Sequence, residues 1–220
     1  MSTSPHRGPA PDGARLVLAT RNRHKVVELR AILADSLVAE GADVDLNRVV
    51  GVDAFPDVAD VVESGVTFEE NALLKARAVA EATGLPALAD DSGLAVDVLG
   101  GAPGIFSARW SGRHGDDRAN LELLLAQLAD VPDEHRAAGF VCAAALVHPG
   151  GVEHVELGHL RGSLERAPRG DNGFGYDPIL RVDGDARTLA ELEPDEKNAI
   201  SHRSRALRAI APALLDVLRG

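Results

Sequence analysis

The pattern of apolar and polar positions along the chain alternates between strand-like runs and helix-like periods. Continuous apolar runs predict strands at 15–19, 44–52, 87–89, 137–147 and 152–164. Apolar residues three and four positions apart predict helices at about 23–37, 67–83, 121–128 and 196–218. Pro149-Gly150-Gly151 predicts a hairpin between the last two strands. This order predicts an α/β fold with a mixed sheet covered by helices.

Residues that favour helix ends refine two of these helices. Thr67 is followed three residues later by Glu70, the pattern of a capping box, which predicts a helix start. Gly84 and Pro86 predict the end of the same helix. Pro212 predicts a kink in the last helix.

Composition limits the architecture. The chain has 220 residues, 45% hydrophobic and only 3% aromatic, which fits either one domain over 14–220 or two lobes that share a core; in both cases the core is built from Ala, Val and Leu. Residues 1–13 hold three prolines and two glycines and predict a disordered tail. Cys142 is the only cysteine, lies in an apolar run and is expected to act as a small hydrophobe.

Charge and hydropathy exclude several kinds of partner. The net charge of −11 argues against a nucleic-acid surface, although a nucleotide needs only a local cationic pocket. The N-terminal residues 1–15 contain no apolar core of signal-peptide length, and no segment of the chain approaches the length of a membrane span. We therefore expect a cytoplasmic protein with neither nucleic acid nor membrane as a partner.

The segment from Ala87 to Gly112 carries the strongest chemical signal. A short apolar strand leads directly into Asp90 and Asp91, followed by Ser92 and a glycine-rich loop. Buried carboxylates need compensation, and a magnesium ion with substrate phosphates would supply it. A solvated Asp-Asp-Ser-Gly turn at the end of the strand fits this segment equally well.

Two further segments place polar groups on helices. Thr20, Asn22 and Lys25 lie where a strand ends and a helix begins, which suits either phosphate binding or ordinary helix capping, and no Walker A pattern is present. Asn71 and Lys75 share one helix face, and Glu63 precedes them in a loop. Lys75 either reaches a buried anion or extends to solvent.

The last two segments favour contact with a base. Residues 169–177 combine three glycines with Phe174 and Tyr176, which suits stacking on a base; the alternative is a long turn whose aromatics cover the core. Lys197, His202 and Arg203 supply two cations and an imidazole, but helix surfaces often carry such residues.

Together these segments resemble the inosine/xanthosine triphosphate pyrophosphatases, which hydrolyse dITP, ITP and XTP. The matching pieces, in the family's order over about 15–218, are TRNRHK at 20–25, ESGVTFEENALLKA at 63–76, ADDSGLAVDVLGGAPGIFSAR at 89–109, GFGYDPIL at 173–180 and EKNAISHR at 196–203. The chain departs from the family's usual residues at Trp110, Asp171-Asn172 and Ser204.

The resemblance implies a two-lobed α/β fold with a long central mixed sheet, an active-site cleft between the lobes, Mg²⁺ and a homodimer. It implies hydrolysis of the α–β phosphoanhydride of a nucleoside triphosphate. Asp91 and Lys75 would be catalytic, and Asp91 and Glu63 would hold the metal. The implied substrate-binding residues are Thr20, Arg21, Asn22, Arg23, His24, Lys25, Asn71, Ser92, Phe174, Gly175, Tyr176, Asp177, Lys197, His202 and Arg203.

Two alternatives remain at this point. One is a septum-inhibitor-like pyrophosphatase that acts on pyrimidine or modified nucleotides. The other is a nucleotide-binding module without catalysis. The segment 197–203 favours the purine enzyme, and the acidic residues Glu63, Asp90 and Asp91 argue against a pure binding module.

Overall fold

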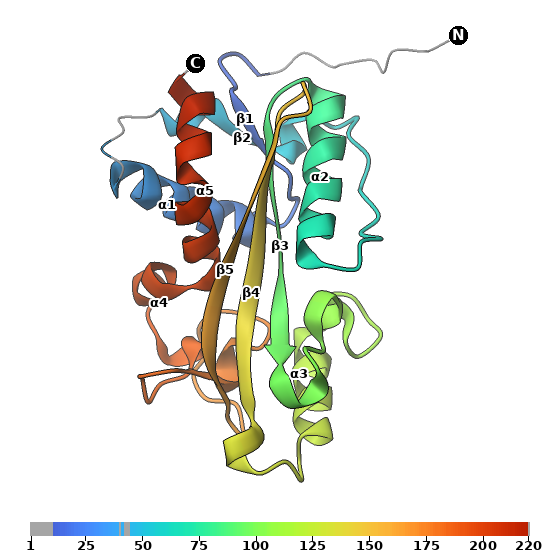
Figure 1. Ribbon diagram of the computed structural model, residues 1–220, viewed down its shortest axis with the longest axis vertical. Helices are drawn as coiled ribbons and strands as arrows, with labels where there is room; N and C mark the ends of the chain where they lie inside the picture. The colour runs from blue at the N-terminus through green and yellow to red at the C-terminus, as the bar shows by residue number, and fades with distance from the viewer. Residues whose placement is uncertain (1–10, 40, 42–44, 220) are drawn as a thin grey trace. The chain divides into compact units, whose positions relative to one another are not determined.

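The computed structural model describes residues 11–39, 41 and 45–219, and these form an α/β fold around one mixed sheet. The sheet order is β2-β1-β3-β4-β5-β6, with β2 and β3 parallel to β1 and with β6 antiparallel to β5 (Figure 1). The strands are β1 (Leu16–Leu18), β2 (Val49–Gly51), β3 (Ala87–Val96), β4 (Ala137–Val147), β5 (Glu153–Leu164) and β6 (Leu180–Val182). The predicted α/β class and mixed sheet are confirmed. Residues 1–10 of the predicted tail lie outside the described residues.

The helices are α1 (Arg23–Ala39), α2 (Phe68–Thr83), α3 (Asp117–Gln127), α4 (Pro194–Ile200) and α5 (His202–Arg219). Along the described part of the chain, none of them combines the length and the apolar character that a membrane span needs. The predicted strand at 44–52 is shortened to β2, because 3-10 turns at Leu46–Arg48 and Val52–Ala54 flank it.

Contacts divide the chain into two compact units. The first contains Met1–Asp91, Ala143–Leu157 and Ala206–Gly220, and the second contains Ser92–Cys142 and Gly158–Arg205. Each unit has its own apolar core. One apolar cluster of the first unit is mostly alanine and valine, and the cluster of the second unit is rich in leucine. Cys142 is buried and forms no disulfide, as expected of a small hydrophobe.

Strand β3 corrects the interpretation of the acidic pair. It does not end before Asp90 and Asp91 but continues through them to Val96, so the solvated-turn alternative is wrong. The parallel register aligns Leu18 of β1 with Leu88, two residues before the pair. Because successive side chains of a strand point to opposite faces, the two carboxylates are directed to opposite sides of the sheet.

The start of α2 is built almost as predicted. The Thr67 hydroxyl accepts the Glu70 amide at 3.1 Å, and Gly84 ends the helix with a φ of 71°. The Glu70 carboxylate, however, accepts the amide of Val66 at 2.7 Å, so the reciprocal capping-box bond is shifted by one residue. The helix that presents Asn71 and Lys75 is therefore fixed at both ends.

Removing this cap should destabilise the protein measurably. We expect Thr67→Ala to lower the free energy of unfolding by about 1 kcal/mol, because one amide of the first turn loses its acceptor. Urea denaturation measures the change. Thr67→Ser keeps the hydroxyl, so its free energy of unfolding should fall by much less than that of Thr67→Ala. An equal decrease in both variants would contradict the capping role.

The C-terminal helical region is two helices rather than one. Ser201 adopts an extended conformation (ψ 157°) between α4 and α5, and its hydroxyl accepts the amide of Ser204 at 3.1 Å. Helix α5 continues past Pro212 to Arg219. The break at Ser201 places Lys197 in α4, and it places His202 and Arg203 in the first turn of α5.

Candidate active site

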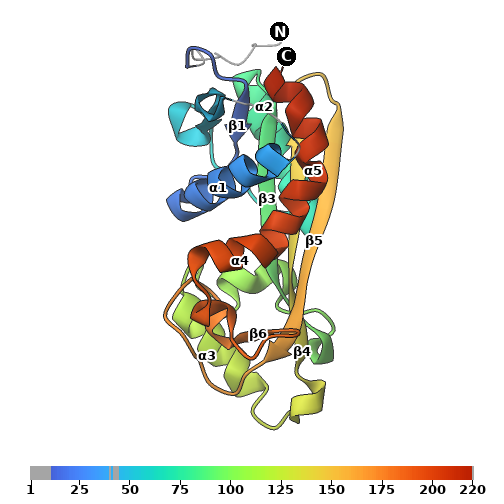
Figure 2. The same ribbon diagram turned by 90° about the vertical axis from the view of Figure 1, so that its left-hand side faces the viewer.

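The two carboxylates of β3 each meet a lysine from a different helix. Lys25 Nζ of α1 lies 3.1 Å from Asp90 Oδ2. Lys75 Nζ of α2 lies 3.5 Å from Asp91 Oδ1 and 2.7 Å from Glu63 Oε1. Figures 1 and 2 show α1 and α2 on opposite sides of β3, as the alternation of the strand requires. We call Lys25, Glu63, Asn71, Lys75, Asp90 and Asp91 the carboxylate–lysine cluster; all of them belong to the first unit.

Asn71 fixes the orientation of Asp91. Its side chain is fully buried; Nδ2 donates to Asp91 Oδ2 at 3.2 Å, and Oδ1 accepts the amide of Gly65 at 2.8 Å. A Cβ at Gly65 would lie 2.8 Å from that Oδ1 and 2.7 Å from Glu70 Cβ, so only glycine fits there. Gly65 thus lets the loop that carries Glu63 approach α2, a role that the sequence analysis missed.

Burial dominates the electrostatics of the cluster. It raises the pKa of Asp91 above its usual range, and the positive charge of Lys75 offsets only part of this effect. Burial alone would lower the pKa of Lys75, but attraction by Asp91, Asp90 and Glu63 outweighs it, so the pKa is raised. Lys75 is therefore a charged ammonium at neutral pH that holds two carboxylates together.

The cluster also fits a divalent cation. No three His, Cys, Asp or Glu side chains among the described residues are grouped closely enough to hold a metal alone. Magnesium needs no such group, since it takes one or two carboxylates and completes its shell with water and substrate phosphates. Asp91 and Glu63 already share one cation, the Lys75 ammonium, and both offer the oxygen donors that magnesium prefers.

The turn before α1 is a helix cap. Asn22 Oδ1 accepts the amide of Lys25 at 3.4 Å, which fits the capping alternative for Asn22, whereas Thr20 Oγ1 accepts the amide of Asn22 at 3.2 Å, in the turn before the helix. Arg21 lies 2.7 Å from Asp60 and 3.3 Å from Asp53, so its guanidinium is engaged by the acidic loop. This position does not support the expected contact of Arg21 with phosphate.

The side chains of two other expected phosphate ligands, Arg23 and His24, lie outside the described part of the structure. Their contact with substrate stays a prediction.

In the second unit, an exposed aromatic ring lies against two cations. Phe174 is 41% exposed; Lys197 Nζ lies 4.9 Å and Arg203 Cζ 5.2 Å from the centroid of its ring. Arg203 Nη2 also donates to Ser92 Oγ at 2.9 Å. Such a ring can stack on a base while the cations donate hydrogen bonds. We call Ser92, Phe174, Asp177, Lys197 and Arg203 the base-end cluster.

Asp177 organises this cluster. Its buried Oδ2 accepts Lys197 Nζ at 2.7 Å and the amide of Phe174 at 2.9 Å. A Cβ at Gly173 would lie only 2.2 Å from the same oxygen, and Gly173 has a φ of 76°. The glycine is therefore required for the loop to close on Asp177.

The structure corrects the expected roles of two ring side chains. Tyr176 is buried in the core of the second unit and donates its hydroxyl to the Ser107 carbonyl at 2.9 Å. Its ring is not a stacking platform, and burial raises its pKa. His202 is buried and stacks on Phe140 with ring centroids 4.8 Å apart. Its imidazole is packed in the interior, and this position does not support the expected contact of His202 with substrate.

The sequence analysis missed two residues that support the base-end cluster. Ser107 accepts the amide of Leu94 at 2.9 Å through its hydroxyl, and a Cβ at Gly93 would lie 2.4 Å from that oxygen. Asp117 accepts the amide of Gly175 at 3.0 Å. Both contacts join residues more than ten positions apart in the chain, and no local pattern indicates them.

The fold has a mixed α/β sheet with lysine–carboxylate pairs beside its parallel strands, and an exposed ring lies close to two cations. These features fit the class of proteins that bind nucleoside phosphates. Residues 16–213 match the model of the Ham1 family, and the chain belongs to this family.

Similar proteins agree with this assignment. The dITP/XTP pyrophosphatase of Streptomyces avermitilis is 65% identical over 204 residues, which cover 93% of this chain and 98% of that protein. A HAM1 protein from Coxiella burnetii has a similar structure, with a TM-score of 0.80, 41% identity and coverage of 91% of this chain and 98% of that one. The dITP/XTP pyrophosphatase of Mycobacterium abscessus matches with a TM-score of 0.71, 52% identity and coverage of 90% and 98%.

Proposed function

We propose that this protein hydrolyses dITP, ITP and XTP to the nucleoside monophosphate and pyrophosphate, and so removes non-standard purines from the nucleotide pool. The observation that carries the proposal is the contact of Lys75 with both Glu63 and Asp91, in a chain that is 65% identical to a dITP/XTP pyrophosphatase. A pure binding module would gain little from buried carboxylates that face a polyanion. The 65% identity to a dITP/XTP pyrophosphatase favours the purine enzyme over the pyrimidine alternative.

The carboxylate–lysine cluster suits the phosphate end of the substrate. Asp91 and Glu63 would hold Mg²⁺, which when bound neutralises charge that develops on the triphosphate. Asn71 keeps the Asp91 carboxylate in one orientation, and Lys75 holds Asp91 and Glu63 together. The ammonium groups of Lys25 and Lys75 offset negative charge on the departing pyrophosphate.

The base-end cluster suits a purine with a 6-keto oxygen. Phe174 offers a face for stacking, and Lys197 and Arg203 carry only donors. A keto oxygen accepts hydrogen bonds from such groups, whereas the 6-amino group of adenine opposes a donor with a donor. Asp91 and Ser92 are consecutive residues of β3, so the strand carries a phosphate-end residue and a base-end residue side by side in sequence.

A panel of nucleoside triphosphates tests the proposal. Pyrophosphate release should be fast for ITP, dITP and XTP and slow for ATP, and it should require Mg²⁺. Inorganic phosphate as the product would contradict cleavage at the α–β bond. Equal rates for ITP and ATP would contradict the assignment of the base.

Lys25 should distinguish the triphosphate from the monophosphate. In an Asp91→Asn background, which separates binding from turnover, we expect Lys25→Ala to weaken ITP binding about tenfold to a hundredfold. Binding of IMP should change little, because the monophosphate lacks the outer phosphates. Isothermal titration calorimetry measures both constants. Lys25→Arg keeps the charge and serves as the control, and equal losses for ITP and IMP would show that Lys25 acts elsewhere.

The resemblance also suggests a homodimer, a cytoplasmic location and a cleft between two lobes, which remain predictions. Size-exclusion chromatography with light scattering tests the dimer.

A further inference from the structure

We propose that Asp117, the first residue of α3, is a positioning residue for the base end of the substrate, because it holds the loop that presents Phe174. The inference rests on the proposed function and adds to it a residue outside every segment assigned to substrate. Asp117 acts through the backbone of Gly175, the residue that follows Phe174.

The contact falls on the residue that controls the direction of the loop. Asp117 Oδ2 accepts the amide of Gly175 at 3.0 Å. Gly175 lies between Phe174 and Tyr176 and has a φ of 62°, in the left-handed region that glycine enters without penalty. A glycine is also free to leave that region. An acceptor on its amide therefore restrains the peptide that joins it to Phe174.

Two carboxylates accept successive backbone amides of the loop. Asp177, inside the loop, accepts the amide of Phe174 at 2.9 Å, and Asp117, from α3, accepts the next amide. Asp177 also holds Lys197, so its replacement would disturb a cation as well as the backbone. Asp117 offers a way to change the position of the loop while both cations of the base-end cluster remain.

Asp117 and its neighbour Asp116 have separate tasks. Asp116 is the N-cap of α3, and its side chain accepts the amide of Ala119 at 3.2 Å. Asp117 is exposed in the first helical turn, and its carboxylate accepts the Gly175 amide in a charge-assisted hydrogen bond. Loss of Asp116 should weaken the helix, and loss of Asp117 should release the loop.

Release of the loop should lower the apparent affinity of the protein for the base end of the substrate. If Phe174 occupies its stacking position in only a fraction of molecules, the observed dissociation constant rises by the inverse of that fraction. The loss of a hydrogen bond to an exposed charged acceptor corresponds to roughly a three- to tenfold change. The bond-breaking step is not involved, so kcat should remain close to that of the unchanged protein.

The test compares Asp117→Ala, Asp117→Asn and Asp116→Ala in the full chain. We measure KM and kcat for ITP, the dissociation constant of IMP by calorimetry, the melting temperature, and hydrogen exchange of the peptide that contains Gly175. Asp117→Ala should raise both the KM for ITP and the dissociation constant of IMP about three- to tenfold. It should also speed hydrogen exchange of the peptide that contains Gly175. Asp117→Asn keeps an acceptor oxygen and should retain most of the affinity. Asp116→Ala should lower the melting temperature and leave KM unchanged.

Three results would overturn the inference: an unchanged KM in Asp117→Ala, an equal rise of KM in Asp116→Ala, or unchanged exchange at Gly175. Failure of the unchanged protein to hydrolyse ITP or bind IMP would instead overturn the proposed function. Hydrogen exchange would still decide, in that case, whether Asp117 holds the loop.

Discussion

Asp91→Asn is expected to reduce pyrophosphate release from ITP by about a hundredfold or more, with the fold intact. The amide is nearly isosteric with the carboxylate and can still accept the hydrogen bond from Asn71. It is a poor magnesium ligand and a poor base, so the phosphate end loses the charge on which it depends. Steady-state assays with saturating Mg²⁺ measure the loss. Near-normal activity in a folded Asp91→Asn protein would contradict the assignment.

The same substitution should not destabilise the protein at neutral pH. The pKa of Asp91 is raised by burial, so its contribution to stability is complete below the unfolded pKa and is lost as pH rises through the folded pKa. Above the folded pKa of Asp91 the ionised group opposes folding, and the neutral amide should there give an equal or higher melting temperature. For the same reason, activity should fall on acidification at a higher pH than an ordinary carboxylate would cause.

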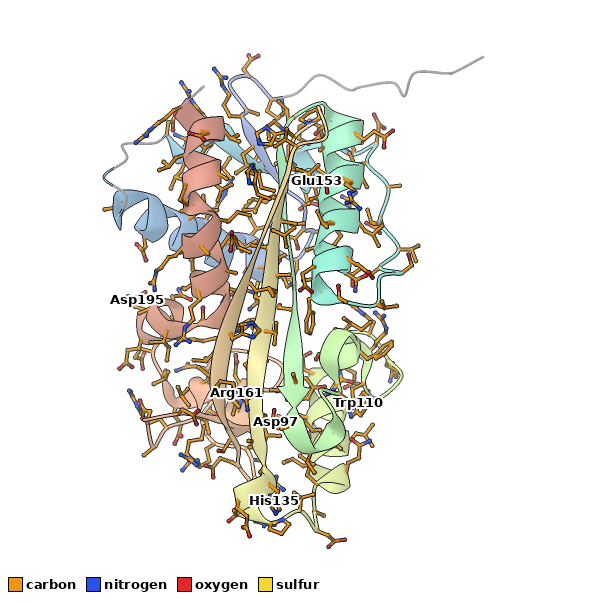
Figure 3. The ribbon with its side chains drawn as sticks, in the orientation of Figure 1. Asp97, Trp110, His135, Glu153, Arg161 and Asp195 are labelled. Carbon is orange, nitrogen blue, oxygen red and sulfur yellow. The ribbon has the colours of Figure 1, made fainter. Side chains whose placement is uncertain are left out.

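Asp97 provides the matched control for Asp91. It follows β3 directly, is exposed, and pairs with Arg161 at an Oδ1–Nη1 distance of 3.0 Å; Figure 3 shows the two labelled side chains close together. The hydrogen bond from Arg161 lowers the pKa of Asp97, the opposite direction to Asp91. Asp97→Asn should therefore leave activity unchanged and cost a small amount of stability at neutral pH.

Much of the fold could be predicted from local pattern. Apolar runs located β4 and β5 to within a residue, because long strands with a glycine turn carry a strong local signal. The acidic pair in β3 was misjudged as a strand end. Two carboxylates inside a buried strand are tolerated here because Lys25 and Lys75 arrive from helices distant in sequence. A single segment carries no information about such partners.

The candidate site shows the same limit. The resemblance placed Phe174 and Arg203 at the base end, and the structure brings them together. The scarcity of aromatic residues also suggested a ligand role for the Tyr176 ring, but that ring fills the core. Whether an aromatic side chain faces solvent or interior depends on what packs behind the loop, in this case Ser107, which lies 69 residues away in the chain.

Arg203→Ala is expected to lower kcat/KM for ITP on the order of a hundredfold. It should lower kcat/KM for ATP much less, so the ratio of the ITP value to the ATP value decreases. Arg203 is an obligate donor beside the exposed ring of Phe174, and it also donates to Ser92. The variant removes a donor that a 6-keto oxygen needs and that adenine cannot use.

Two controls make the result specific. Arg203→Lys keeps the positive charge but loses the planar guanidinium group. If the geometry of the donor matters, this variant should restore only part of the ratio of kcat/KM for ITP to kcat/KM for ATP. Arg205→Ala, on the same helix, removes an exposed side chain that donates to the His159 carbonyl, and it should leave the ratio intact. Guanine also carries a 6-keto oxygen, so GTP should lose activity in parallel with ITP if Arg203 reads that atom. An unchanged ratio of ITP to ATP in Arg203→Ala would place base selection on other residues of the base-end cluster.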